Sequence, residues 1–349
     1  EPEALLIGLN FALHGAKAGI VPGGSGKSPA LMQGFAPRLN RTARAVNVVD
    51  GPEHKNSMAI NWYPGHMATA RKAAAESMKK VDLVIEVLDA RIPHSSCNPM
   101  FEALRRQGQR PALKLLNKAD FADPEITRRW LQHYNSLPDV KAVSLCAKRP
   151  KEIQRIPGLC QAMLPGRGTR LKPLRMMILG IPNVGKSTLM NGLLGRHVAS
   201  VGDEPAITKH QMLHALGTGM TLMDTPGMLW PGMTQYVSYK LAATHGIGRA
   251  AYEDEDVAVH LAGYLVNQYP ALLTKRFGPL TADCDGHGLL ETIAQVRCLA
   301  RKAGGLDLAR AATTLLNEFR SGALGPMSLE TVEQCAASVS EPRFDIVAS

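Results

Sequence analysis

Aromatic residues, cysteines and long apolar runs are all scarce in this 349-residue chain. Aromatic side chains make up 5% of the residues, and no stacking motif of the single-stranded RNA binders is present. No apolar run approaches the roughly 20 residues that a membrane-spanning helix requires. The six cysteines include no C-x-x-C pair and have no histidine partner at zinc-binding spacing. These absences argue against a zinc module and a membrane span, and they favour reduced thiols in a cytosolic compartment.

Positive charge is the main compositional excess. The chain has 40 lysines and arginines against 30 acidic residues, which gives a net charge of +10 and a pI near 9.4. This balance favours a polyanionic partner, because cations that meet phosphates gain affinity by releasing counterions. For any one basic cluster, ordinary solvated surface is the alternative. The length gives room for about two domains, and 45% hydrophobic residues are enough to fill their cores.

Residues 180–187 read GIPNVGKS and have the G-x-x-x-x-G-K-S spacing of a phosphate-binding loop. The apolar run 176–179 before them predicts a buried strand, and Thr188 continues into a predicted helix. Glycines in such a loop let backbone N–H groups turn toward phosphates. Lys186 would reach the β- and γ-phosphates, and the Ser187 hydroxyl would bind a magnesium ion. The sequence therefore predicts a nucleoside triphosphate site at this strand end.

Residues 224–227 read DTPG and follow a second apolar run, 221–223. Here Asp224 is expected to act on the magnesium ion, and the Gly227 amide is expected to face the γ-phosphate. Ras-like enzymes carry a glutamine directly after this glycine, but this chain has Met228. Because an apolar side chain can neither orient nor deprotonate water, the group that positions the attacking water must come from elsewhere.

Residues 117–120 read NKAD and close the apolar run 112–116, so they also lie at the carboxyl end of a predicted strand. The Asp120 carboxylate can accept the N1–H and 2-amino hydrogens of guanine, whereas adenine offers neither donor there. The SLCAK stretch at 144–148 would add a base contact through the Ala147 amide, and a plain strand-to-loop turn is the alternative. The sequence therefore predicts a guanine nucleotide.

The guanine motif precedes the phosphate loop, which is the reverse of the order in ordinary GTP-binding domains. We therefore expect a circularly permuted P-loop GTPase domain of the α/β class, with a doubly wound and mostly parallel sheet, followed by a small all-α domain. The Gly/Pro/basic stretch 164–173 fits the joint that such a permutation needs. Strands are predicted at 81–88, 112–116, 140–144, 176–179 and 221–224, with 210–216 antiparallel at one edge, and helices at 67–80, 236–250, 255–268, 289–303, 306–321 and 328–338.

With these motifs the chain resembles the YlqF/RbgA family of circularly permuted ribosome-assembly GTPases, whose mitochondrial relatives share the layout. The resemblance runs from about residue 58 to residue 329 and includes NWYPGHM at 61–67, LDARIPHSSCNP at 88–99 and a tail pattern at 304–325. It implies GTP hydrolysis to GDP and phosphate, and a precursor of the large ribosomal subunit as partner, with no membrane and a monomer off the ribosome. The implied location is the bacterial cytoplasm, with the mitochondrial matrix as the alternative.

The chain departs from the family pattern at three positions. Family members usually carry Lys where Thr69 stands, Ser where Cys146 stands and Gly where Ala206 stands. These departures concern the switch geometry and the base loop, and none removes a phosphate or magnesium ligand. The DARIP stretch at 89–93 is open to two interpretations, a position close to the nucleotide or a structural turn held by an Asp–Arg pair.

The resemblance also implies roles for single residues. His66, the histidine of PGHM, is a candidate for positioning the attacking water, and a buttress for the turn after Pro64 is the alternative. Asn183 matches a position that helps hold a potassium ion in related GTPases, and a local turn-stabilising hydrogen bond is the alternative. The expected GTP contacts are Asn117, Lys118, Asp120, Ala147, Asn183, Val184, Gly185, Lys186, Ser187, Thr188, Thr208 and Gly227, with Ser187, Thr208 and Asp224 on Mg²⁺ and His66 and Lys186 in catalysis.

The chain is expected to divide into three parts. Residues 1–57 are interpreted as a disordered non-core extension, because they are rich in Gly, Ala and Pro and show no sustained period; a transit peptide is the alternative. The GGSGKS stretch at 23–28 has no strand before it and lacks the first loop glycine. Residues 58–235 would form the GTP-binding domain and residues 236–349 a helical domain that contacts RNA or the ribosome. Since the chain enters the helical domain just after DTPG, loss of the γ-phosphate would reorient that domain.

Two other classes of protein remain as alternatives. A nucleotide-gated RNA-binding scaffold, in which hydrolysis is incidental, is favoured by the missing glutamine after DTPG. A metabolic P-loop kinase is disfavoured, because such an enzyme would have no need of the NKAD motif.

Overall fold

The computed structural model describes residues 66–195, 212–217, 219–302 and 304–337, with the side chains of the first helix described from residue 72 onward. The described residues belong to one compact unit. Several sequence predictions concern residues outside the described ones: the extension 1–57, the side chain of His66, and the positions of Ala206 and Thr208. They stay predictions.

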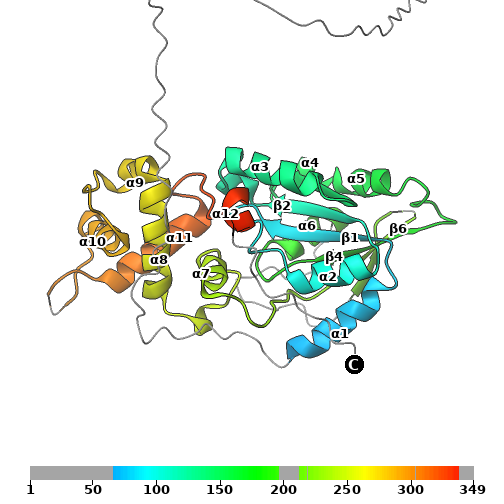
Figure 1. Cartoon of the computed structure of the whole chain (residues 1–349), viewed down its shortest axis with the longest axis horizontal. Coiled ribbons are helices and arrows are strands. Elements are labelled where there is room, and N and C mark those ends of the chain that lie inside the picture. The colour runs from blue at the N-terminus through cyan, green and yellow to red at the C-terminus, as the bar shows by residue number, and fades with distance from the viewer. Residues whose placement is uncertain (1–65, 196–211, 218, 303, 338–349) are drawn as a thin grey trace, which may run out of the picture. The chain divides into compact units, whose positions relative to one another are not determined.

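The described strands form one six-stranded sheet in the order β3-β2-β1-β4-β6-β5 (Figure 1). Neighbouring strands run parallel except at the β5 edge, where β5 is antiparallel to β6. This confirms the mostly parallel sheet and its single antiparallel edge. The strands are β1 (Leu83–Asp89), β2 (Ala112–Asn117), β3 (Val140–Ser144), β4 (Leu174–Leu179), β5 (Met212–Ala215) and β6 (Met220–Asp224).

Helices cover both faces of the sheet, as a doubly wound fold requires (Figure 1). Successive residues of a strand point to opposite faces, so Leu83, Ile85 and Val87 of β1 pack in one cluster with α4, α5 and α6. Val84 and Leu88 point the other way, into clusters that include α1, α2 and α3. These helices are α1 (His66–Met78), α2 (Pro99–Gln107), α3 (Pro124–Asn135), α4 (Pro150–Ile153), α5 (Ile156–Met163) and α6 (Lys186–Leu194).

Beyond β6 the described elements are helical. They are α7 (Gln235–Ala243), η2 (Arg249–Ala251), α8 (Asp254–Gln268), α9 (Pro270–Phe277), α10 (Gly286–Val296), α11 (Leu308–Ser321) and α12 (Val332–Ala337). Helix α8 is central and contacts α7, α9, α10 and α11. Among the described residues, no helix has both the length and the apolar character that a membrane crossing needs.

The sequence misjudged four features of this helical part, and one of them is the helix predicted at 328–338, which begins only at Val332. The helix predicted at 236–250 ends at Ala243, because His245 has a positive φ of 69° that an α-helix does not accommodate. The helix predicted at 289–303 ends at Val296, and Cys298 beyond it has a φ of 51°. Helix α9 was not predicted; Pro270 occupies its first turn, where a missing N–H costs nothing.

The segment between α11 and α12 contacts the part of the chain that forms the sheet. The Met327 amide donates to the Phe121 carbonyl at 3.0 Å, and the Leu329 amide donates to the Arg91 carbonyl at 2.8 Å. The Glu330 carboxylate, 0% exposed, accepts from Ser95 Oγ at 2.6 Å and pairs with Lys240 Nζ of α7 at 3.0 Å. The buried Glu330 carboxylate therefore links α7 and the loop after β1 through charge-assisted interactions with both.

Candidate functional site

The guanine motif and the phosphate loop, 63 positions apart in sequence, touch in the structure. Asn117 ends β2 and the phosphate loop follows β4, with β1 between these two strands in the sheet. The carboxyl ends of parallel strands meet at one edge, where α/β sheets bind ligands. Asn117 Nδ2 donates to the Val184 carbonyl at 2.7 Å, and Lys118 Nζ donates to the Asn183 carbonyl at 2.7 Å. Two side chains of one motif therefore hold the backbone of the other.

Lys118 is held on its other side by Asp89, the last residue of β1. Their Nζ and Oδ2 atoms are 3.0 Å apart, and Arg91 forms a two-pronged pair with the same carboxylate, at 2.7 Å and 2.9 Å. Burial alone would raise the pKa of the Asp89 carboxyl, but Arg91 and Lys118 hold it below its ordinary value. The Asp–Arg turn expected from DARIP is present, and it also positions the lysine of the guanine motif.

Asp120 lies in the one-turn helix η1 (Ala119–Phe121), and its side chain is exposed. Burial raises the pKa of the neighbouring Cys146 thiol, and a hydrogen bond to Asp120 adds to that shift, so the two side chains are close. The Ala147 amide donates to Asn117 Oδ1 at 2.8 Å. Its observed role is therefore to fix the orientation of Asn117, and its direct contact with a base stays a prediction.

The phosphate loop has the backbone that its glycines predict. Gly180 and Gly185 have φ values of 152° and 98°, in the region that favours glycine. A Cβ on Gly180 would lie 2.6 Å from the Val87 carbonyl oxygen, so the loop passes directly against β1. Lys186, the first residue of α6, donates to the carbonyls of Gly180 and Ile181 at 3.0 Å and 2.8 Å. The ammonium group thus lies over the loop that would hold the phosphates.

Two ionisable groups of opposite sign lie buried at this loop. Burial lowers the pKa of Lys186 to about 8, partly offset by Asp224. Burial raises the pKa of Asp224, partly offset by Lys186 and by the Thr225 amide. For both groups, the free-energy cost of burying the charge is larger than the stabilisation that neighbouring protein groups provide. A bound polyanion would stabilise the charged form of Lys186, and a bound cation would stabilise the carboxylate of Asp224.

Magnesium fits the donors present here. Ser187, at the start of α6, offers a hydroxyl oxygen and Asp224 at the end of β6 offers a carboxylate, and Mg²⁺ prefers such oxygen ligands together with phosphate oxygens and water. No group of three or more His, Cys, Asp or Glu side chains that could hold a metal ion occurs among the described residues.

The DTPG segment packs closely on the phosphate loop. Thr225 Oγ1 donates to the Ile178 carbonyl of β4 at 2.6 Å. A Cβ on Gly227 would lie 3.0 Å from both Lys186 Nζ and the Pro182 backbone, so glycine is needed for this approach. Met228 is buried in a cluster with Ala74 and Met78 of α1, the helix that begins at His66.

Asn183 connects the phosphate loop to the helical part. Its φ is 57°, and its Nδ2 donates to the His245 carbonyl at 2.9 Å. His245, in the loop after α7, was not expected from the sequence; no motif marks it, and its positive φ is visible only in the structure. The loop that would contact phosphates is thus bonded directly to the segment that follows α7.

The pKa of Lys186 predicts a pH dependence of nucleotide binding. In the free protein this amine loses its proton near pH 8, whereas phosphate oxygens would raise its pKa in the complex. Affinity should therefore be constant below about pH 8 and should fall above it, by at most about tenfold per pH unit, with a proton uptake on binding that rises from near zero at pH 7 toward one proton at pH 9. Calorimetry of GDP binding between pH 7 and pH 9, in two buffers of different ionisation enthalpy, measures both quantities.

Lys186→Met is the matched control for this measurement, because it removes the titrating amine and leaves the titrations of the nucleotide in place. The difference between wild type and the variant isolates the lysine. Absence of proton uptake by the wild type at pH 8.5 would contradict the prediction.

Comparison with known proteins places this site in context. A family model described as 50S ribosome-binding GTPase matches residues 175–276. Ribosome biogenesis GTPase A of Bacillus cereus is 36% identical over 292 residues, which cover 81% of this chain and 98% of that protein. Mitochondrial ribosome-associated GTPase 1 of Mus musculus is 32% identical over 295 residues, covering 77% and 89%. The solved GNP-bound YlqF of T. maritima shares the fold, with a TM-score of 0.53, 23% identity and coverage of 75% and 98%.

Proposed function

The chain belongs to the family of the ribosome biogenesis GTPase A proteins, and we propose from this premise that it binds a maturing large ribosomal subunit in its GTP form and leaves after hydrolysis. As a GTPase it converts GTP to GDP and phosphate. The observation that carries the proposal is the interlock of NKAD with the phosphate loop through Asn117 and Lys118. A scaffold in which hydrolysis is incidental is not favoured.

The roles proposed for the site residues follow from their places in this pocket. Asp120, exposed in η1, would pair with guanine, and Asn117 and Lys118 would hold the phosphate loop beside it. Lys186 and the amides of the phosphate loop from Asn183 to Thr188 would bind the phosphates, and the Gly227 amide would face the γ-phosphate. Mg²⁺, held by Ser187, Asp224 and Thr208, would neutralise the charge that develops on the phosphates.

His66 is proposed to position the attacking water. The residue after DTPG is Met228, which is buried in an apolar cluster and cannot act on water. That cluster includes two residues of α1, whose first residue is His66, so α1 packs against the segment that senses the γ-phosphate. This packing supports the proposal; it does not place the imidazole.

The helical part is proposed as the element that responds to hydrolysis, with the boundary between the two domains near residue 235. Helix α7 begins eight positions after Gly227, and Asn183 bonds to the loop after α7. A shift of either segment on loss of the γ-phosphate would be passed to α8 and its neighbours. We further propose a cytoplasmic monomer off the ribosome, with the mitochondrial matrix as the alternative location.

One experiment tests the proposed function. GTP turnover is measured with and without purified large subunits, in potassium and in sodium buffer, for wild type and His66→Ala. We expect large subunits to stimulate the wild type, and His66→Ala to lose about 100-fold of the stimulated rate while it retains GTP binding, as loss of a general acid–base or water-positioning group does. A faster rate in potassium would support Asn183 as a potassium ligand.

His287→Ala is the control, because this exposed histidine lies on α10 in the helical part. A full stimulated rate for His66→Ala would remove the catalytic role of His66. Equal rates with and without large subunits for the wild type would contradict the proposed function itself.

A further inference from the structure

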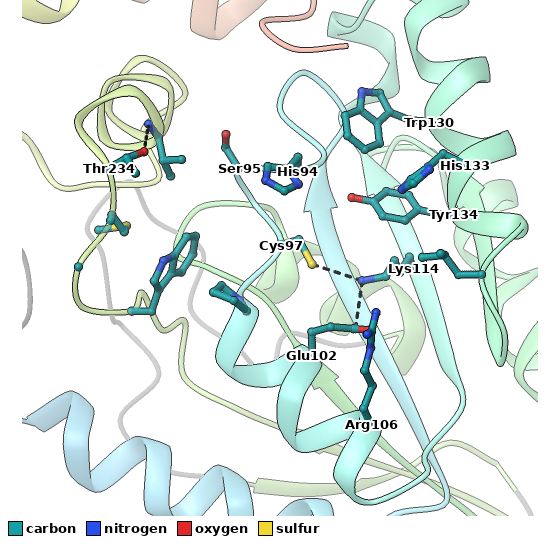
Figure 2. Close-up of a pocket in the computed structure, with 16 residues that line it drawn as sticks. His94, Ser95, Cys97, Glu102, Arg106, Lys114, Trp130, His133, Tyr134 and Thr234 are labelled. Carbon is teal, nitrogen blue, oxygen red and sulfur yellow. Dashed lines mark hydrogen bonds and ion pairs between the residues drawn. The ribbon is translucent and has the colours of Figure 1, made fainter. Parts of the chain in front are cut away.

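A cavity lies on the sheet face that α2 and α3 cover, and its lining includes no residue of NKAD, the phosphate loop or DTPG (Figure 2). Its volume is about 290 Å³, close to the lower end of the roughly 300–1,000 Å³ typical of small-molecule sites. Its walls come from the loop after β1, from Lys114 of β2, from α2 and α3, from the segment 230–234 that links DTPG to α7, and from Val237 of α7. None of these lining residues is needed for the roles proposed above.

Five of the sixteen lining residues carry aromatic rings, and three of them, Trp130, Tyr134 and Trp230, are buried. Trp130 stacks on His94 with ring centroids 6.4 Å apart, contacts His133 edge-on at 5.6 Å and lies 5.4 Å from Tyr134. Figure 2 shows His94 facing the α3 side chains Trp130, His133 and Tyr134. Trp230 adds a second indole from the segment after DTPG. Aromatic residues make up only 5% of the chain, so their share of this lining is well above their share of the sequence.

Cations accompany the rings. Lys114 lines the cavity with its ammonium 5.1 Å from the Tyr134 ring centroid, and it pairs with Glu86 and, at 3.7 Å, with Glu102. Burial would lower the pKa of Lys114, but Cys97 and these two carboxylates raise it, so it stays charged. Arg106 also lines the cavity, and 67% of its side chain is exposed. Its Nε donates to Glu102 Oε1 at 2.7 Å, and the remaining N–H groups of the exposed guanidinium can donate to a phosphate beside the cavity.

We propose that this cavity takes one unstacked base of RNA, with Arg106 on the adjoining phosphate. Proteins recognise single-stranded RNA by stacking splayed bases on Trp, Tyr and His rings and by placing cations on the backbone. Rings line this cavity, the Arg106 side chain on its lining is largely exposed although its Nε donates to Glu102, and the chain carries a net charge of +10. The inference rests on the proposed function in one respect, that the RNA is that of the large subunit.

The cavity is also joined to the GTP site. Asn98 caps α2, the helix that carries Glu102 and Arg106, and its Nδ2 donates to the Met228 carbonyl at 3.0 Å. Met228 directly follows DTPG, and the opposite wall begins two residues later at Trp230. A base held between these walls would contact the segment that senses the γ-phosphate.

The first test uses the isolated full chain saturated with GDP, so that the GTP site is filled, and AMP as the probe. Two of the three tryptophans line the cavity, so AMP binding should quench tryptophan fluorescence in a saturable manner. His133→Ala, at an exposed position, should weaken AMP binding about tenfold, as expected for loss of one stacking ring. His287→Ala is the matched control and should bind AMP like the wild type.

The second test identifies the occupant on the ribosome. A photoreactive benzophenone amino acid in place of Met233, a lining residue, is activated in complexes with large-subunit precursors. A crosslink to RNA supports the proposal. Three results would each overturn the proposal. AMP could fail to quench tryptophan fluorescence in a saturable manner, His133→Ala could bind AMP as tightly as the wild type, or the crosslink could form to a ribosomal protein alone. If the chain does not bind the particles at all, the proposed function is contradicted. The AMP titration still tests whether the cavity binds a base.

Discussion

Asp120→Asn should weaken GTP binding by about 1,000-fold or more and should create binding of xanthosine triphosphate. The wild-type carboxylate accepts two hydrogens from guanine; an amide accepts one and turns its N–H₂ toward the second donor. Sites built to hydrogen-bond a polar group reject the wrong partner by such factors. In xanthine a carbonyl replaces the 2-amino group, so the asparagine amide can donate to it. Competition binding with GTP, XTP and ATP measures the exchange.

Because Asp120 is exposed, this substitution should change nucleotide recognition without changing the fold. Its side chain packs in no core cluster, so the fold should be unaffected, and circular dichroism and thermal unfolding serve as checks. Asp283→Asn, at an exposed position of the helical part, is the matched control and should retain the nucleotide preference. Unchanged GTP affinity in Asp120→Asn would show that NKAD does not read the base in this chain.

Gly185→Ala should weaken GTP and GDP alike, by about 100-fold. The new Cβ would lie 2.3 Å from Asn117 Nδ2, and a φ of 98° is one that alanine rarely adopts. Asn117 would have to move, which would break its bonds to the Val184 carbonyl and to the Ala147 amide. Strain and broken bonds of this kind cost roughly 1–3 kcal/mol each, and about 2.8 kcal/mol corresponds to 100-fold.

Two further variants sharpen this result. Gly166→Ala is the control, because a Cβ there meets no atom within 4 Å, and it should bind both nucleotides normally. Asn117→Ala removes the same bonds from the opposite side, so it should resemble Gly185→Ala, and the double variant should lose much less than the sum of the two. Additive losses would contradict the interlock of the two motifs.

The packing of the two motifs explains how the site can form although NKAD precedes the phosphate loop in the sequence. Asn117 and Lys118 reach the phosphate loop across β1, and Asp89 at the end of β1 pairs with Lys118. None of these contacts depends on the order in which the strands are connected. The permutation changes which segments the chain leads into, and here it leads from DTPG directly into α7.

Motifs and strand ends could be predicted from the sequence because local patterns encode them. Apolar runs located the strands, and the placement of NKAD and GIPNVGKS at strand ends implied a shared edge of the sheet. The Asp–Arg turn at 89–91 was foreseen as one of two interpretations, and its contact with Lys118 was not. The helical part was predicted as a class, but the ends of α7 and α10 were wrong, since positive φ values at His245 and Cys298 leave no sequence signal.

The sequence by itself determined the chemistry of this protein, because phosphate and guanine recognition need fixed residue types at short, fixed spacing. Tertiary structure alone decided which backbone atoms those residues hold, that Asn183 is bonded to His245, and that rings from three separate segments enclose a cavity on one face of the sheet. Such contacts join residues tens to hundreds of positions apart, and their geometry arises only when the whole chain packs, since no local pattern records a distant neighbour.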